Sequence, residues 1–483
     1  MSSLENKESI LKGVVVYSIS TWANVILGFL SVVILTRVIK PDVYGLTMMF
    51  LSASSVLLYV FTLGTDSAYI RFYNEPPQGN TKTQLLYKNL IWGCCLCLIV
   101  GCIICLILGN SISGKIFGIE SRWVVFMLLI YTICSVGLRY LNISFRMSFN
   151  AKKYNIQNIL MNCAGRFLII IAAIISSDFN FIVTILTIGY FIVYVVYLII
   201  QRKEFIPINE NGERDFTISY MGFSEYFKYA LFSAPTYIVV YLNTFLGQNI
   251  INSRLDAYAL GIFTSTGAFS AILGAMKGGF STYWSAYTYK NYNDEQERIK
   301  KMHDFVVFAS IIMASILVMG RDFVYLFIGK DFHESKNIFS LLLAMPILSF
   351  ALETTQKGIE IAKKNQITLL NYIISVSSNL ALCFLLIKPM GILGAAYANA
   401  VSAVILYILN TVSGQKYYRT ISSYPKSIRG ILLLVSILVF PSIFANIWII
   451  ICFTLLIDII TFVSYKQEVE YSFNIVKNLL KRR

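Results

Sequence analysis

The sequence is poor in charged residues and in histidine, and these shortages exclude several classes of protein. Charged residues make up 13% of the 483 positions, whereas soluble globular domains carry about 25%. Two histidines, His303 and His333, are too few for a histidine-based metal site. No Gly-Lys-Ser or Gly-Lys-Thr phosphate-binding sequence occurs, which argues against an ATP-driven pump.

Long polar stretches are also scarce. Apolar runs of about twenty residues, enough to cross a bilayer, recur from Val14 to Val463 with short polar gaps between them. The runs are continuous and do not alternate, so they predict helices and exclude a β-barrel. With 57% hydrophobic residues, the chain is expected to be an all-α integral membrane protein that moves something across the membrane. The first apolar run is not followed by a small-residue cleavage site and is read as a retained helix.

Nine cysteines are present, and five of them crowd one apolar run. Small apolar side chains of this kind commonly fill space in a membrane helix. We therefore expect neither a metal site nor a cofactor. The five residues are Cys94, Cys95, Cys97, Cys102 and Cys105.

The hydropathy pattern predicts about fourteen transmembrane helices, and this even number places both termini on the same side of the membrane. If that side is the cytoplasm, the inner segments hold 28 Lys and Arg residues and the outer segments hold 9. This bias favours a multi-pass protein of a bacterial cytoplasmic membrane with both termini inside. It also explains the net charge of +15 without nucleic acid as a partner. The expected helices lie at 13–36, 44–65, 85–108, 123–145, 156–176, 179–200, 224–247, 258–284, 304–320, 337–360, 366–387, 391–411, 428–444 and 446–464.

The longest polar stretch between helices divides the chain into two parts. It predicts an N-terminal six-helix bundle, a cytoplasmic linker, a C-terminal six-helix bundle, two additional helices and a basic cytoplasmic tail. The two additional helices are almost uniformly apolar, and they could pack as an accessory pair or contact a lipid chain. The respective ranges are 1–200, 201–223, 224–411, 412–465 and 466–483.

A short motif occurs near the start of both bundles. One copy runs from Arg37 through Pro41 to Gly45, and the other from Arg254 to Gly261. Each copy follows an odd-numbered helix and opens the next one, so the two halves share one orientation. Parallel repeats of this kind occur in secondary transporters, where the substrate binds between the halves. Chance similarity between apolar sequences is the alternative.

Several predicted helices carry polar or small residues three or four positions apart, which places them on one face. Serines and glycines in such a stripe could simply allow close helix packing. Charged side chains need water or a partner, because an ionised group within a span costs several kcal/mol. A water-filled, cationic central cavity lined by Arg166, Lys277 and Arg139 explains these charges together. Arg139 could instead extend to the membrane interface.

A cationic cavity selects an anion, because Arg forks suit phosphate oxygens and Lys supplies a point charge. Three carboxylates, Glu353, Glu360 and Asp66, are candidates for proton or sodium coupling. A structural ion pair is an equal reading for Glu353. Pro235 and Gly28 lie in the first helix of each bundle and could bend or loosen it during alternating access.

Five segments resemble polysaccharide-biosynthesis flippases, the O-antigen and capsule repeat-unit translocases of the multidrug/oligosaccharidyl-lipid/polysaccharide exporter superfamily. Their order and spacing carry the resemblance, which covers most of the chain. The segments are Lys12–Trp22, Pro41–Leu46, Gly64–Tyr73, Leu255–Phe263 and Gly391–Ala398.

The resemblance implies two six-helix bundles in a V shape, as in multidrug exporters of that superfamily, plus two additional helices. It implies translocation of an undecaprenyl-diphosphate-linked oligosaccharide to the outer leaflet, with polymerase and ligase machinery as partners. Asp66 and Arg71 occupy family positions after the second helix, where they could form a gate or an interfacial ion pair. The family often has an Asp near the end of the seventh helix, where this chain has Gly247-Gln248-Asn249.

Two other functions remain open at this stage. A cation-coupled multidrug antiporter of the same superfamily would favour carboxylates in its cavity, whereas bases outnumber acids within these spans. A membrane glycosyltransferase or polymerase would need a sizeable outer loop or paired acidic residues to activate a sugar. The predicted outer loops are all short, so a secondary transporter is favoured over an enzyme.

Overall fold

The computed structural model describes residues 2–78, 80–148, 150–208, 213–216, 223–444 and 446–470. All the named elements in this part are helices, as expected from the continuous apolar runs. The linker residues 209–212 and 217–222 and the tail residues 471–483 lie outside the described residues. The helices are α1 (Ser2–Val38), α2 (Pro41–Thr62), α3 (Thr65–Phe72), α4 (Lys82–Phe117), α5 (Arg122–Met147), α6 (Ala151–Ile175), α7 (Phe179–Ile200), α8 (Arg202–Phe205), α9 (Phe223–Arg254), α10 (Ala257–Ser265), α11 (Gly267–Asn291), α12 (Gln296–Met319), α13 (Arg321–Tyr325), the 3-10 helix η1 (Lys330–Ser335), α14 (Lys336–Leu342), α15 (Ala344–Thr355), α16 (Lys357–Ile361), α17 (Asn365–Tyr417), α18 (Tyr424–Ile443) and α19 (Ile447–Ser464).

Local sequence explains where several helices begin and end. Thr81 and Gln84 form a capping box at the start of α4, and Asp178 accepts a hydrogen bond from the Phe181 amide at the start of α7. These caps satisfy amides that have no partner within the helix. Pro41 stands in the first turn of α2, where its missing N–H costs nothing. Gly118 ends α4 in the left-handed conformation.

Thirteen candidate membrane spans occur in the described residues, judged by length and composition. One of them, α17, extends over 53 residues, far more than the twenty or so that a bilayer needs. Its backbone is not helical at Gly391, where φ is 58° and ψ is −140°. In a straight helix, residues eight positions apart are separated by about 12 Å along the axis. Here a Cβ added to Gly394 would lie only 2.2 Å from the carbonyl oxygen of Leu386.

The chain therefore reverses direction at Gly391. The side-chain amide of Asn371 donates a hydrogen bond to the side-chain oxygen of Asn410 over 3.1 Å. The Ser375 hydroxyl donates to the backbone carbonyl oxygen of Ser402 over 2.8 Å. These pairs converge on the turn, as in an antiparallel hairpin. Counting α17 as two helices confirms the fourteen spans predicted from the sequence, and the predicted break between 387 and 391 coincides with the turn.

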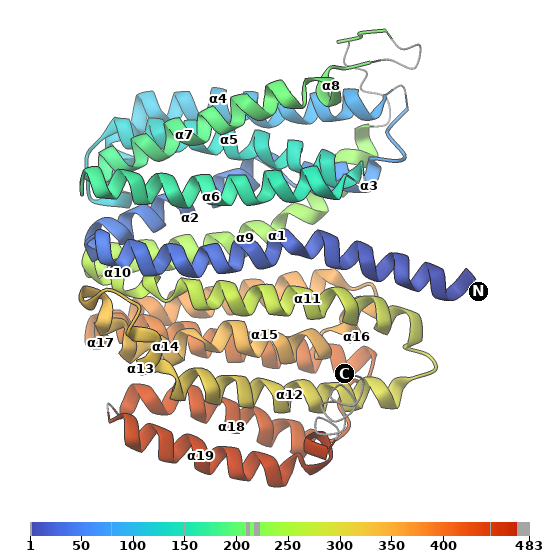
Figure 1. Ribbon diagram of the computed structural model, residues 1–483, viewed down its shortest axis with the longest axis vertical. Helices are drawn as coiled ribbons and strands as arrows, with labels where there is room; N and C mark the ends of the chain where they lie inside the picture. Colours follow the sequence, from blue (N-terminus) through green and yellow to red (C-terminus); the bar gives the residue numbers. More distant parts are fainter. Residues whose placement is uncertain are drawn as a thin grey trace. The chain divides into compact units, whose positions relative to one another are not determined.

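The contacts divide the chain into two compact units, Met1–Gly261 and Ile262–Arg483. In the first unit, α5 packs against α4 and α7, α1 packs against α6, and α9 packs on α2 and α3. In the second, α15 packs against both α17 and α12, and α12 also contacts α18 and α19. Figure 1 shows the long helices of each unit lying side by side. This clustering places α9 in the first unit, whereas the predicted linker places it in the second bundle. The predicted bundle boundaries stay a prediction.

Large apolar side chains occur on both the inside and the outside of each unit. Met49, Phe50 and Leu138 are fully buried in the first unit. In contrast, Leu106 and Val463 are more than 70% exposed. An outer surface of this kind suits hydrocarbon and would be unfavourable in water. The chain is a multi-pass membrane protein.

The two copies of the short motif contact each other within the first unit. A Cβ added to Gly45 would lie 2.7 Å from the Ala257 carbonyl oxygen, and one added to Gly261 would lie 1.8 Å from that of Pro41. Pro41 lies four positions before Gly45, and Ala257 four positions before Gly261. In each motif, the glycine and the residue four positions before it therefore contact the corresponding residues of the other motif. Reciprocal contacts of this kind are what a two-fold relation between similar segments produces.

Candidate functional site

A polar pocket of about 450 Å³ lies inside the first unit. Its two charged lining residues are arginines, Arg139 and Arg146, and the described residues that line it include no carboxylate. The remaining polar groups are hydroxyls and amides, which can bind an anion or a sugar. The polar lining residues are Ser54, Ser55, Tyr131, Ser135, Arg139, Asn142, Arg146, Tyr154, Asn158 and Tyr190.

One face of α5 forms much of this pocket. Ser135, Arg139, Asn142 and Arg146 are spaced three or four positions apart and all line it, because this spacing places residues on one side of a helix. Away from this stripe, α5 is largely apolar and packs against its neighbours, with Val136, Leu138 and Leu141 fully buried. The polar stripe predicted from the sequence is thus the wall of a pocket.

Arg139 is held in this wall by a buried carboxylate. Its Nε donates to Asp66 Oδ2 over 2.7 Å, and its Nη2 donates to the same oxygen. The Asp66 side chain is 2% exposed, so the pair removes the cost of burying an isolated charge. The guanidinium also lies 4.9 Å from the ring centre of Tyr59, which adds a cation–π contact. Arg139 and Asp66, predicted for different roles, therefore act as one unit.

Arg146 enters the same pocket without a salt bridge in the part of the chain that the structure describes. It was not among the substrate-binding candidates, although it belongs to the polar stripe of α5. Its position seven residues after Arg139 is the signal that could have identified it, because such residues lie on one side of a helix. An unpaired guanidinium retains its donors for a ligand.

Arg166 lies beside this pocket, on the contact between α6 and α1. Its Nη1 donates to the Asn24 carbonyl oxygen over 2.7 Å. The Asn24 side chain donates to Asn158, a lining residue, over 3.1 Å. A Cβ at Gly28 would come within 3.0 Å of the Arg166 guanidinium. Gly28, predicted as a hinge, therefore makes room for this side chain, while its role as a hinge stays a prediction.

In the second unit, four charged side chains form a chain of alternating sign. Lys277 on α11 lies 3.7 Å from Glu353 on α15. Glu353 lies 2.8 Å from Lys357, which lies 2.7 Å from Glu360. Two positive and two negative charges balance, so Lys277 adds no net charge here, and its predicted binding role stays untested.

Lys357 is the centre of this chain and was missed as a candidate residue. Its side chain is 2% exposed, and Ser285 accepts a third contact from it over 2.8 Å. Its spacing from Glu353 and Glu360, four and three positions, is that of ion pairs along a helix and could have identified it. Hydroxyl groups complete the network, with Ser281 donating to Glu353 and Tyr289 donating to Glu360.

The two other predicted gate or hinge residues lie away from these groups. Arg71 forms an exposed pair with Glu75 over 2.9 Å, and Pro235 stands inside the continuous helix α9. Neither position tests a gating role. In the described residues, no group of three or more His, Cys, Asp and Glu side chains could hold a metal ion.

Comparison with known proteins identifies relatives of the sequence and of the fold. The family model for "polysaccharide biosynthesis protein" matches residues 10–286. No curated protein matches the chain.

Solved structures share the fold at low sequence identity. A lipid II flippase MurJ in an inward closed conformation has a TM-score of 0.66 at 17% identity, covering 94% of this chain and 100% of that one. An inward-facing multidrug resistance transporter of the MATE family and MOP superfamily has a TM-score of 0.56 at 13% identity, with coverage of 82% and 95%. A MOP superfamily transporter from Pyrococcus furiosus, whose description notes reverse polarity of its binding pocket, has a TM-score of 0.51 at 14% identity, with coverage of 84% and 96%. These likenesses show that the chain shares an all-helical fold with these proteins.

Proposed function

The chain belongs to the polysaccharide biosynthesis protein family, and we propose that it is a flippase for a lipid-linked oligosaccharide. The substrate we infer is an undecaprenyl-diphosphate-linked repeat unit of the O-antigen or capsule type. The protein carries it from the cytoplasmic to the outer leaflet of a bacterial cytoplasmic membrane by alternating access. It acts as a secondary transporter and forms no covalent bond with the substrate.

The observation that supports this substrate is the charge of the pocket in the first unit. Arg139 and Arg146 are its charged lining residues in the described part of the chain, and arginine forks match phosphate oxygens. A volume of about 450 Å³ falls in the usual range for small-molecule sites, about 300–1,000 Å³. The pocket can therefore hold a diphosphate headgroup, while the polyprenyl chain and most of the glycan lie outside it.

The same charge disfavours the multidrug antiporter. Arg146, which has no salt bridge in the described residues, would repel a cationic drug, and the carboxylate of Asp66 is already bonded to Arg139. The solved structure of a flippase with a similar fold supports the choice further. Gain of drug resistance without any effect on lipid-linked glycan would reverse this choice.

The membrane potential helps to drive the outward movement. An inside-negative potential favours moving an anion out by about 2.3 kcal/mol per charge per 100 mV. Counter-transport of protons or sodium through Glu353, Glu360 or Asp66 could add to it. A flipping rate in vesicles that is indifferent to imposed pH and sodium gradients would eliminate this coupling. Polymerase and ligase proteins would receive the flipped repeat unit.

Arg146 provides the sharpest test of the binding site. We expect Arg146→Ala to slow flipping of lipid-linked oligosaccharide in vesicles by about tenfold or more, since a hydrogen bond to a charged group contributes about 1.5–3 kcal/mol. Arg146→Lys should retain part of the rate, because Lys keeps the charge but loses the fork. In the native host, the alanine variant should accumulate the lipid-linked glycan on the cytoplasmic side.

Lys152→Ala is the matched control. Lys152 is exposed at the start of α6 and does not line the pocket, so this variant should flip at the wild-type rate. Equal rates for Arg146→Ala and the control would overturn the assignment of this pocket to the substrate headgroup.

A further inference from the structure

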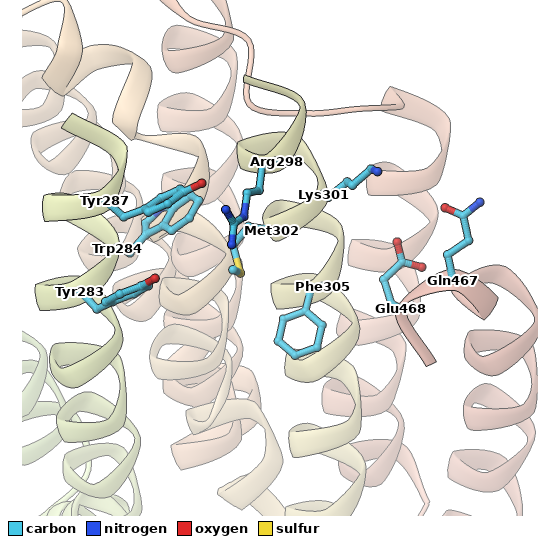
Figure 2. Close-up of a pocket in the computed structure, with 9 residues that line it drawn as sticks. All are labelled: Tyr283, Trp284, Tyr287, Arg298, Lys301, Met302, Phe305, Gln467 and Glu468. Atoms are coloured by element: carbon cyan, nitrogen blue, oxygen red, sulfur yellow. The ribbon is translucent and has the colours of Figure 1, made fainter. Parts of the chain in front are cut away.

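A second pocket, of about 440 Å³, lies between α11, α12 and the segment that follows α19. Figure 2 shows the aromatic side chains of α11 on one side, Arg298 beside them, and Lys301 extending toward the segment that carries Glu468. All of its lining residues belong to the second unit. The chain of alternating charges described above has no member in its lining.

Two residues of the aromatic wall, Trp284 and Tyr287, already make contacts of their own. Trp284 stacks on Phe280 and on Tyr287, with ring centres 5.9 and 5.7 Å apart. Arg298 lies over the ring of Tyr287 at 5.5 Å. These contacts occupy ring faces of Trp284 and Tyr287, whereas Tyr283 is 61% exposed. The charged and hydrogen-bonding groups of the pocket are the part of the lining that distinguishes one ligand charge from another.

The cations of the pocket exceed its available carboxylates. Glu468 Oε1 accepts from Lys426 over 2.7 Å, and Glu295 accepts from Arg298 over 3.1 Å. Hydrogen bonds from Tyr287 and then Arg298 hold the pKa of Glu295 below its usual value, so it stays ionised at neutral pH. Lys301 forms no ion pair within the described residues.

Donor groups in the pocket have few acceptors. The guanidinium of Arg298 has five N–H donors, and one of them serves Glu295. Trp284 is fully buried, and its indole N–H has no acceptor in the described structure. A ligand that only accepts hydrogen bonds and carries negative charge would complement such a set, and phosphate oxygens have both properties.

The position of the pocket indicates where such a phosphate comes from. α11 ends at Asn291, α12 begins at Gln296 and α19 ends at Ser464, so the pocket lies at the ends of three membrane helices. Tyr, Trp, Lys and Arg side chains gather at this depth in membrane proteins. Met302 and Phe305 continue the lining along α12, which provides apolar contacts for an acyl chain beneath the headgroup.

We propose that this pocket binds the phosphate headgroup of an anionic phospholipid, with Arg298 and Lys301 as its cationic ligands. Basic pockets between helices on the cytoplasmic side recognise such headgroups in other membrane proteins. The assignment concerns lipid binding and does not depend on which substrate the protein flips.

Titration of the purified protein with short-chain phosphatidylglycerol, followed by native mass spectrometry, tests the proposal. We expect saturable binding that phosphatidylcholine does not reproduce, and at least a tenfold weaker affinity in an Arg298→Gln/Lys301→Gln variant. Lys300→Gln is the matched control, because Lys300 lies on the same turn, pairs with Glu297 and does not line the pocket. Lys301→Gln alone, at an exposed position, serves if the double variant does not fold and should weaken binding at least threefold.

Two results would overturn the proposal. The first is equal affinity of the pocket variants and the Lys300→Gln control for phosphatidylglycerol. The second is competition by inorganic phosphate at the concentration at which the lipid binds, because it would identify a soluble phosphate as the ligand.

Discussion

Several buried charged residues in this protein have partners at hydrogen-bonding distance. Lys357 contacts two carboxylates and one hydroxyl. The Asp66 side chain is almost fully buried and forms a salt bridge with the guanidinium of Arg139. Arg146 differs, because it enters a pocket with no carboxylate among its described lining residues. The contrast separates charges with a structural partner from a charge that remains available to a ligand.

A double-mutant cycle on Glu353 and Lys357 measures how much the network depends on pairing. Lys357→Met should destabilise the protein by about 3–5 kcal/mol, because it leaves a carboxylate buried without its nearest partner. Glu353→Gln combined with Lys357→Met should cost clearly less, since the double variant buries one charge fewer. Thermal unfolding in detergent gives the comparison. A double variant less stable than Lys357→Met would show that the pair contributes more than mutual neutralisation.

At the scale of elements, the turn in α17 converts one long helix into two antiparallel spans. Gly391 adopts a positive φ of 58°, a conformation in which any residue with a Cβ is strained. Nothing lies within 4 Å of the position that its Cβ would occupy. The need for glycine is therefore conformational and not steric.

Gly391→Ala should destabilise the protein by about 1–3 kcal/mol, the usual cost of such backbone strain. Gly165→Ala is the control, because Gly165 lies inside α6, also has open space around it and has no positive φ. There alanine should be neutral or stabilising, since it is the better helix former. Equal unfolding midpoints for the two variants would show that the turn in α17 relaxes without strain.

The sequence predicted this element correctly, and the reason lies in particular residues. Lys388, Pro389 and Gly391 interrupt an apolar run, and each disfavours a continuous buried helix. Pairing between distant side chains is not periodic and could not be predicted in the same way. Nothing in the spacing of Asp66 and Arg139 indicates that they meet, because their contact depends on how α3 packs against α5.

The candidate site was predictable to the same extent. The stripe on α5 indicated a polar face, and the structure shows that this face lines a pocket. Which arginine in the stripe has a partner, Arg139 or Arg146, depends on a carboxylate from another helix. Arg166 was predicted from its depth in the membrane, but its position at the contact between α1 and α6 follows from packing.

At the scale of the whole molecule, the distribution of basic residues predicts how the chain crosses the membrane. In a cysteine-free background, Lys388→Cys at the turn of α17 should react with an impermeant maleimide in intact cells. Lys152→Cys at the start of α6 should react only after the membrane is permeabilised. Both positions are exposed in the structure. The reverse pattern of labelling would place the termini outside and overturn the predicted topology.

The contact between Gly45 and Gly261 has a consequence for movement. At this point two stretches of main chain meet without side chains between them. Where side chains of two helices interdigitate, these side-chain contacts must break before the helices can separate. Because no side chains interlock at this contact, α2 and the start of α10 can move relative to each other here without changes in side-chain packing.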